Sequence, residues 1–268
     1  MRDAVVRLLV VAVVASLLPT LAMAVPAAAP APACHAASGA QRGELVELYT
    51  SEGCSSCPPA DKWFARLAAT ADPARLSLLA FHVDYWDSIG WPDRFGSAAN
   101  SARQNARVTG AGSKSVYTPQ VMLGPRVGFP WGNPTATAAL RTAQGMTSAL
   151  ALSLHATQRP SGLDVGAAAA PAPGKQLPAS DLYVALYEDG LSTDVMAGEN
   201  AGAVLRHERV VRALLGPYRL GGAGWSRLLH VVPPFDAEAR RLGLVAFVQS
   251  PAGETQQALT LPLAACAR

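Results

Sequence analysis

The stretch Gly53-Cys54-Ser55-Ser56-Cys57-Pro58-Pro59 places a CxxC pair of thiols between two segments with different hydrophobic periods. Residues 45–50 before it form an apolar run typical of a strand, and residues 60–68 after it have helical spacing. A strand that passes through CxxC into a helix puts the first sulfur at the helix N-terminus, where backbone N–H groups and the dipole favour a thiolate. The stretch therefore predicts a redox site, with Cys54 attacking from an exposed turn and Cys57, one turn into the helix, resolving.

Length, composition and charge limit the other classes of function. The 268-residue chain carries 22 Lys and Arg against 19 Asp and Glu, a net charge of +3, and half of its residues are apolar. Such a chain can bury a full core and hold one large domain or two ordinary ones. Its small net charge does not suggest a nucleic acid or an anionic membrane as partner, and we expect neither. We also expect no cofactor.

The first residues have the pattern of a secretory signal peptide over 1–24. Arg2 and Arg7 precede the apolar run 8–21, and Ala22-Met23-Ala24 is a small-x-small cleavage site. The alternative is an uncleaved membrane anchor. The pattern predicts export to the periplasm or the extracellular space, with no membrane association after cleavage. Disulfides are permitted in that compartment.

Amino-acid composition and hydrophobic pattern divide the remaining chain into a leader and two predicted domains. Residues 25–42 are rich in Ala and Pro and predict a disordered leader. Residues 43–145 read as strand, CxxC, helix, buried strand over 75–84, helix, and a further strand opened by Pro119. Residues 146–268 contain short alternating runs separated by turn residues, which predict an antiparallel β-sandwich.

Further motifs accompany CxxC, and together they give the chain a family resemblance. They are the stretch 49–61, His82-Val83-Asp84-Tyr85-Trp86-Asp87, Tyr117-Thr118-Pro119-Gln120 and Gly198-Glu199-Asn200. With these motifs the chain resembles an exported bacterial thioredoxin-like family that is carried as a domain of unknown function. The resemblance implies a thioredoxin-like fold for residues 43–145. The predicted fold class is therefore an α/β thioredoxin-like domain followed by an all-β sandwich-like domain. The resemblance supplies no substrate. The CxxC pair predicts thiol–disulfide exchange with protein thiols or disulfides and with an unidentified redox partner.

The resemblance assigns roles to three residues. It implies a cis peptide bond between Thr118 and Pro119, with the Thr118 backbone facing the sulfurs and a bound peptide. It also implies that Glu47 is buried beneath CxxC and accepts the proton of the second thiol. The alternative for Glu47 is an edge-strand side chain that faces water. Residues 124–128 depart from the Gly-Gly-x-Asp glutathione motif of glutaredoxins, so we do not expect glutathione as substrate.

A polar and aromatic segment follows the second strand. In a parallel sheet the carboxyl ends of neighbouring strands lie at one edge, so His82, Asp84 and Trp86 are expected near Cys54. A histidine there can stabilise a thiolate or transfer protons. The alternative for His82 is a core histidine bonded to the backbone.

Outside these motifs, two cysteines remain. Cys34 and Cys266 lie far from CxxC and, in an exported protein, form a structural disulfide in the simplest pairing. The alternative is two free thiols. His207 and Glu208 are expected to be solvated or interface residues rather than ligands.

Other functions for the same CxxC pair stay open at this point. Reduced Cys54 and Cys57 can hold a soft metal such as Cu(I) for binding or delivery. The pair can also form an inert bridge in a non-catalytic thioredoxin-like binding protein. Zinc requires four ligands, and we expect no metal site because the sequence has no second CxxC or Cys/His pair.

Overall fold

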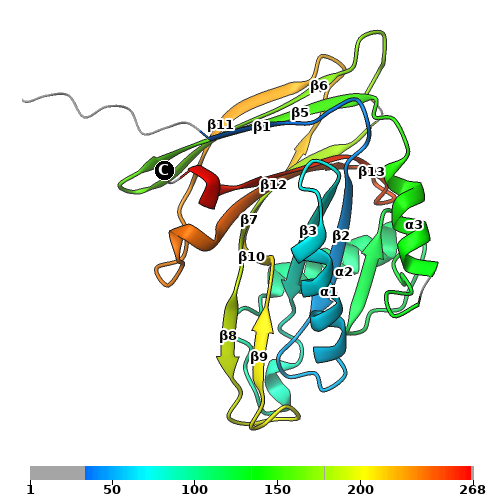
Figure 1. The fold of residues 1–268 in the computed structure, drawn as a ribbon. Coiled ribbons are helices and arrows are strands. Elements are labelled where there is room, and N and C mark those ends of the chain that lie inside the picture. Colours follow the sequence, from blue (N-terminus) through cyan, green and yellow to red (C-terminus); the bar gives the residue numbers. More distant parts are fainter. Residues whose placement is uncertain (1–33, 134, 178, 267–268) are drawn as a thin grey trace, which may run out of the picture. The chain divides into compact units, whose positions relative to one another are not determined.

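A seven-stranded sheet forms the main layer of the computed structural model, which describes residues 34–133, 135–177 and 179–266 (Figure 1). The predicted signal peptide and residues 25–33 of the predicted leader lie outside the described residues. In spatial order the strands are β13 (Thr255–Pro262), β12 (Leu242–Gln249), β7 (Asp181–Glu188), β10 (Val210–Arg219), β3 (Leu76–His82), β2 (Glu44–Thr50) and β4 (Gln120–Leu123). Strand β2 pairs in parallel with β3, as the apolar runs predicted, and antiparallel with β4.

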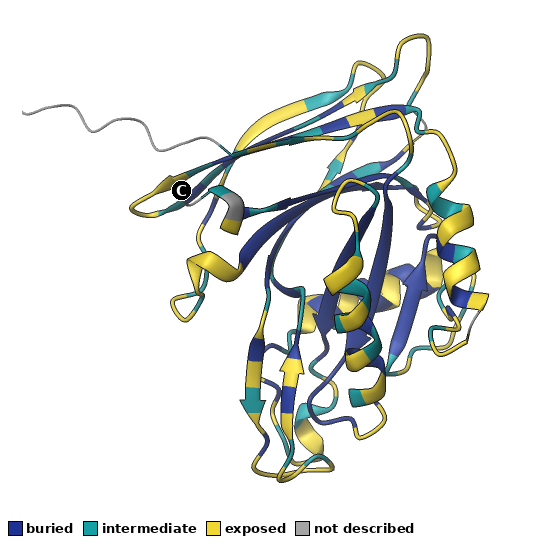
Figure 2. Ribbon diagram, in the orientation of Figure 1, coloured by how far each residue is buried: buried dark blue, intermediate teal, exposed yellow. Residues whose placement is uncertain are grey.

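Helices cover both faces of the sheet around β2 and β3. Helices α1 (Pro58–Thr70) and α3 (Thr135–Gln144) pack against the face that carries Val46 and Leu48. Helix α2 (Ala98–Gly110) packs through Val108 against the opposite face, which carries Leu45 and Tyr49. Successive β2 side chains alternate between these faces, and both faces are buried (Figure 2). The short 3-10 helices are η1 (Asp87–Ile89), η2 (Ala239–Arg241) and η3 (Leu263–Cys266).

A second sheet packs on the C-terminal strands of the first. Its four strands, in spatial order, are β1 (Cys34–Ala37), β5 (Leu150–Arg159), β6 (Gly162–Pro171) and β11 (Trp225–Val231). Leu152 and Val165 from this sheet share a buried apolar cluster with Val184 and Leu244 of the seven-stranded sheet. The described part of the predicted leader is therefore ordered, since β1 pairs with β5.

A hairpin joins β7 to β10 and reaches the start of α1. It consists of β8 (Leu191–Asp194) and β9 (Val204–His207), which pair antiparallel and form a separate two-stranded sheet. In Figure 1 the hairpin extends beyond the seven-stranded sheet alongside α1, and β9 contacts this helix. Residues 195–203 connect the two strands and are called the β8–β9 loop below.

The fold is mostly β, and the prediction of an α/β thioredoxin-like domain followed by a sandwich-like domain is wrong. Strand β10 pairs in parallel with β3, with Val210 beside Ala80, so C-terminal strands extend the sheet begun by β2 and β3. The Ala80 N–H donates to the Arg209 carbonyl at 2.8 Å. The edge of β3 would otherwise expose unpaired backbone groups, and β10 covers it. The alternating apolar runs after residue 146 predicted that this region forms strands, but they did not predict that one of these strands pairs with the free edge of β3.

Candidate functional site

The CxxC turn lies between the end of β2 and the start of α1. Cys57 is the N-cap of α1, and Pro58 and Pro59 occupy its first positions, where a missing N–H is tolerated. The Cys57 N–H donates to the Cys54 carbonyl at 3.1 Å, which closes the turn. Both thiols are free and buried. The expectation of an exposed Cys54 is therefore wrong, since its relative exposure is 0%.

The two thiols have opposite acidities. A hydrogen bond from Cys57, assisted by the Ser56 hydroxyl 3.3 Å away, lowers the pKa of the Cys54 thiol to about 6. Burial raises the pKa of Cys57 far above its usual value, and the neighbouring Cys54 and Asp61 charges add to this rise. Cys54 is consequently the thiol that ionises near neutral pH.

Thr118, Pro119 and Trp86 come together beside Cys54. The Thr118–Pro119 peptide bond is cis. The Thr118 carbonyl oxygen lies 3.8 Å from Cys54 Sγ. The Trp86 indole N–H donates to Thr118 Oγ1 at 2.7 Å, which fixes the indole over this segment.

A buried carboxyl group that the sequence reasoning missed lies beside the second thiol. Asp61 is in the first turn of α1, four residues after Cys57, and accepts a hydrogen bond from Thr50 Oγ1 at 2.9 Å. Burial raises the pKa of Asp61 to about 6. The sequence signal was an acidic residue on the same buried helix face as Ala60 and Phe64.

Glu47 lies on the other face of the sheet. Its Oε2 accepts from Arg103 Nη2 at 2.9 Å and its Oε1 accepts from Arg107 Nε at 3.0 Å, both from α2. Tyr49 and Gln249 also donate to this carboxylate. Burial alone would raise the pKa of Glu47, but the two guanidiniums outweigh burial and hold it at about 2. Strand alternation explains this placement, because Val46 and Leu48 face α1 whereas Glu47 faces α2.

Two histidine–carboxylate pairs form a buried layer next to the CxxC turn. His82 Nδ1 lies 2.6 Å from Asp93 Oδ2, and His207 Nε2 lies 3.1 Å from Glu52 Oε1. The two imidazole rings meet edge to face with centroids 4.7 Å apart. His207 is buried, so the expectation of a solvated or interface residue is wrong.

The remaining acidic candidate, Asp84, has a structural contact. Asp84 Oδ1 accepts a hydrogen bond from the Ser101 hydroxyl of α2, and the Asp84 N–H donates to the same hydroxyl at 3.3 Å. Asp84 therefore joins the end of β3 to α2.

The β8–β9 loop holds the CxxC turn from a distant part of the chain. Asn200 Nδ2 donates to the Glu52 carbonyl at 2.8 Å and to the Cys54 carbonyl at 3.0 Å. Glu199 Oε2 accepts from the backbone N–H and the hydroxyl of Ser55, at 3.0 and 2.7 Å. These contacts give the Gly198-Glu199-Asn200 motif a structural role.

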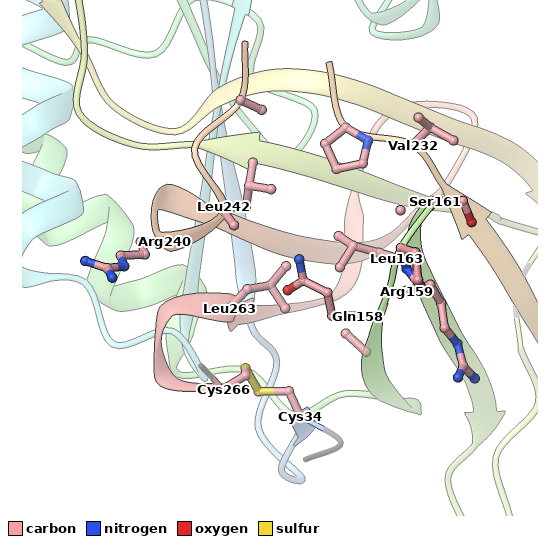
Figure 3. Close-up of a pocket in the computed structure, with 16 residues that line it drawn as sticks. Cys34, Gln158, Arg159, Ser161, Leu163, Val232, Arg240, Leu242, Leu263 and Cys266 are labelled. Atoms are coloured by element: carbon pink, nitrogen blue, oxygen red, sulfur yellow. A yellow bond between two sulfur atoms is a disulfide. The ribbon is translucent and has the colours of Figure 1, made fainter. Parts of the chain in front are cut away.

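Cys34 and Cys266 form a disulfide, as predicted, and their Cα atoms are 5.3 Å apart. The bond joins β1 to η3 at the edge of a cavity of about 620 Å³ (Figure 3). Among the residues that the structure describes, no group of three or more His, Cys, Asp or Glu side chains could hold a metal ion. Within that same part of the chain, no helix has the length and apolar character needed to cross a membrane.

Comparison with known proteins gives a family and related folds. No curated protein sequence is significantly similar to the chain. The fold is similar to the crystal structure of a protein from Agrobacterium tumefaciens, with a TM-score of 0.56 and 23% identity over 84% of this chain and 96% of that one. It is also similar to HBP35 of Porphyromonas gingivalis, with a TM-score of 0.64 and 14% identity over 84% of this chain and 76% of that one. Residues 45–249 match the family model described as "Protein of unknown function (DUF1223)". Because this match spans most of its length, the chain belongs to the DUF1223 family.

Proposed function

We propose that this protein is an exported thiol–disulfide oxidoreductase that exchanges electrons with protein thiols or disulfides through Cys54 and Cys57. The observation that carries the proposal is the difference between the two thiols, since the pKa of Cys54 is lowered to about 6 whereas that of Cys57 is raised. Disulfide exchange needs one thiolate that attacks and a second cysteine that stays protonated until it resolves the mixed disulfide. A structural disulfide that is never reduced does not require its two cysteines to differ in pKa.

The proposed reduction of a partner disulfide proceeds in two steps. The Cys54 thiolate attacks one partner sulfur, forms a mixed disulfide and releases the other partner sulfur as a thiolate. Cys57 then loses its proton and attacks Cys54 Sγ, which releases the second partner thiolate and leaves a Cys54–Cys57 disulfide. Two electrons pass from the cysteine pair to the partner, and the reverse steps oxidise a partner dithiol.

We assign the proton of Cys57 to Asp61 rather than to Glu47. Thr50 links the two groups, because its hydroxyl donates a hydrogen bond to Asp61 and also lowers the pKa of the Cys57 thiol through a hydrogen bond. The pKa of Asp61 itself is raised to about 6. A carboxylate with a pKa near the working pH can accept and return a proton. The carboxylate of Glu47, with a pKa of about 2 and two arginine partners, is a poor acceptor.

A partner reaches Cys54 only after a local opening, because both sulfurs are buried. The β8–β9 loop is held to the CxxC turn by Asn200 and Glu199, and Trp86 is held to Thr118 by one hydrogen bond. Opening the loop would expose the turn, and the Thr118 carbonyl would then face an incoming peptide.

The proposed site of action is the periplasm or the extracellular space. The Cys34–Cys266 disulfide supports this location, because disulfides persist in oxidising compartments. The signal-like pattern over residues 1–24 agrees with it.

The proposal is tested by trapping with matched cysteine variants. The full mature chain carrying Cys57→Ala should form a covalent complex with a model disulfide such as insulin, because Cys54 attacks and nothing resolves the bond. The Cys54→Ser variant should form no such complex, and the wild type should turn insulin over. In cells, the Cys57→Ala variant should retain partners that a reductant releases.

Two results would contradict the proposal. One is equal trapping by the Cys57→Ala and Cys54→Ser variants. The other is stoichiometric Cu(I) bound through both sulfurs in a wild type that does not reduce insulin, which would instead favour metal delivery.

A further inference from the structure

Two imidazoles lie in a buried layer next to the CxxC turn, and the exchange steps above use neither of them. His82 contacts Asp93, and His207 contacts Glu52. Each of these residues is at most 4% exposed. Ionisable side chains that are buried this fully are usually paired, and they affect the ionisation of any other buried group beside them.

Glu52 joins His207 to the CxxC turn. It lies two residues before Cys54, and its Oε1 is 3.1 Å from His207 Nε2. Its Oε2 accepts from the Trp91 indole N–H at 2.9 Å, and its backbone N–H donates to Asp93 Oδ2 at 2.9 Å. The carboxylate can only accept, so His207 Nε2 carries a proton, and the ring becomes a cation when Nδ1 binds a second one.

The two imidazoles differ in whether they can take up that second proton. His82 Nδ1 lies 2.6 Å from Asp93 Oδ2, and its Nε2 is buried without a hydrogen-bond partner among the described residues. A proton on Nε2 would be a buried donor without an acceptor, which is unfavourable. His207 Nδ1 is not among the buried atoms that lack a partner. His207 is therefore the imidazole that can become a cation.

Asp61 is the buried carboxyl group that the charge of His207 reaches. Strand β9 ends at His207 and contacts α1, which carries Asp61 in its first turn. Burial has the largest effect on the pKa of Asp61 and raises it, and the charge of His207 has the largest effect in the opposite direction. The negative charges of Cys54 and Asp93 act together with burial. A cationic His207 therefore favours the ionised form of Asp61.

Other charged groups near the two imidazoles are exposed or paired elsewhere. The Phe95 ring contacts both imidazoles edge to face, and the guanidiniums of Arg94 and Arg212 lie over this ring. Arg94 is exposed to water, and Arg212 pairs with two carboxylates. Within the described residues, His207 is therefore the group that can place a positive charge beside Asp61. The remaining charged residues of the surrounding elements are exposed or bonded elsewhere, namely Lys62, Arg66, Asp87, Asp194, Arg206 and Glu208.

We propose that His207 is a positioning residue for the resolving step, because its imidazolium stabilises the Asp61 carboxylate that receives the Cys57 proton. This inference rests on the proposed exchange function. The proton moves from Cys57 Sγ to the Asp61 carboxylate, and the resulting thiolate attacks the mixed disulfide. Glu52 holds the His207 ring through Nε2 during this transfer. Without the charge of His207, burial would keep a larger fraction of Asp61 protonated at the pH where Cys57 needs a base.

The ionisation of Asp61 tests the proposal directly, because it can be measured without exchange activity. Carboxyl ¹³C NMR on the reduced mature chain gives the midpoint of the Asp61 titration. The midpoint should rise by at least about one pH unit in the His207→Gln variant, whose side-chain amide can still donate to Glu52. His230→Gln is the matched control, because His230 pairs with Asp164 in the four-stranded sheet, and it should leave the midpoint unchanged.

A second measurement needs no variant. Imidazole ¹⁵N NMR of the wild type at pH 6, near the midpoint expected for Asp61, should show both nitrogens of His207 protonated and only Nδ1 of His82 protonated.

The mixed disulfide with insulin reports the consequence for exchange. A rise of one unit from a pKa of about 6 lowers the ionised fraction of Asp61 about fivefold at pH 6, but by less than about a tenth at pH 8. Resolution by the His207→Gln variant should therefore be about fivefold slower than by the wild type at pH 6 and nearly equal to it at pH 8. A structural defect alone would slow resolution at both pH values.

The proposal is overturned if His207 is neutral at pH 6 in the wild type, if a folded His207→Gln variant keeps the wild-type midpoint of Asp61, or if resolution slows equally at pH 6 and pH 8. These outcomes are separate from a failure of the proposed function. A wild type that never reduces insulin would contradict disulfide exchange, while the two NMR measurements would still decide whether His207 and Asp61 are coupled.

Discussion

Two carboxyl groups are buried on opposite faces of the sheet near β2, and their acidities differ in direction. Glu47 faces α2, where two arginines hold its pKa at about 2. Asp61 faces the CxxC side, where burial dominates and raises its pKa to about 6. Burial favours the neutral form of both groups, so their charged partners account for the difference. The face with Glu47 is built for a permanent ion pair, and the face with Asp61 is suited to proton transfer.

The two carboxyl groups make opposite contributions to stability as the pH changes. Glu47 has a lowered pKa in the folded chain, so its contribution is present above the unfolded value of 4.5 and is lost as the pH falls toward 2. Asp61 has a raised pKa, so the folded chain is most favoured below the unfolded value of 3.8 and loses stability as the pH rises through about 6.

The largest expected effect is that of Glu47→Gln. This change leaves the buried guanidiniums of Arg103 and Arg107 without a counter-charge, and breaking a buried ion pair in this way costs about 3–5 kcal/mol. We therefore expect the free energy of unfolding in urea at pH 7 to fall by about that amount. The midpoint of Cys54 alkylation against pH should stay near the value of the wild type, because Glu47 lies on the other face.

Glu254→Gln is the matched control for this prediction. Glu254 pairs with Arg42 at the surface, and such pairs contribute about 0–1 kcal/mol. A Glu47→Gln variant as stable as this control, or one with a shifted Cys54 midpoint, would remove the distinction between the two faces.

The change Asp61→Asn is expected to slow resolution and to stabilise the fold. Without the carboxylate, Cys57 has no proton acceptor, and general-base catalysis contributes about 10²–10⁴-fold. We expect a mixed disulfide with insulin to persist at least 100-fold longer at pH 7. Because burying the Asp61 charge is unfavourable, unfolding at pH 7 should cost about 1–3 kcal/mol more, and this gain should vanish near pH 4.

Asp194→Asn serves as the control, since Asp194 is exposed on β8. It should alter neither the lifetime of the mixed disulfide nor the pH dependence of stability. If Asp61→Asn stabilises the chain but resolution keeps its rate, Asp61 is a buried acid without a role in proton transfer.

The local parts of the fold followed from the sequence, and the distant pairings did not. The apolar runs at 45–50 and 75–84 predicted two buried parallel strands, because a strand that is buried on both faces is apolar along nearly its whole length. The insertion of β10 beside β3 depends on which edge is free in the folded chain. The hydrophobic pattern of β10 does not indicate that this strand pairs with β3.

The candidate site was predictable to the same extent. Alternation along β2 placed Glu47 opposite Val46 and Leu48, but it could not tell which face α1 would cover. His207 was missed because its burial depends on the β8–β9 hairpin lying against α1. Pairing of Cys34 with Cys266 was simpler, since it needed only an even count and an oxidising compartment.

The smallest expected effect concerns the loop that covers the CxxC face. Asn200→Ala removes two hydrogen bonds to the Glu52 and Cys54 carbonyls, and each contributes about 0.5–1.5 kcal/mol net. If alkylation of Cys54 proceeds through loop opening, a loss of at least about 1 kcal/mol from the closed state should speed the reaction with iodoacetamide at least about fivefold at fixed pH. Met196→Ala is the control within the same loop, because Met196 is 78% exposed, and it should react at the rate of the wild type. Equal rates for both variants would mean that Trp86, and not the β8–β9 loop, limits access to Cys54.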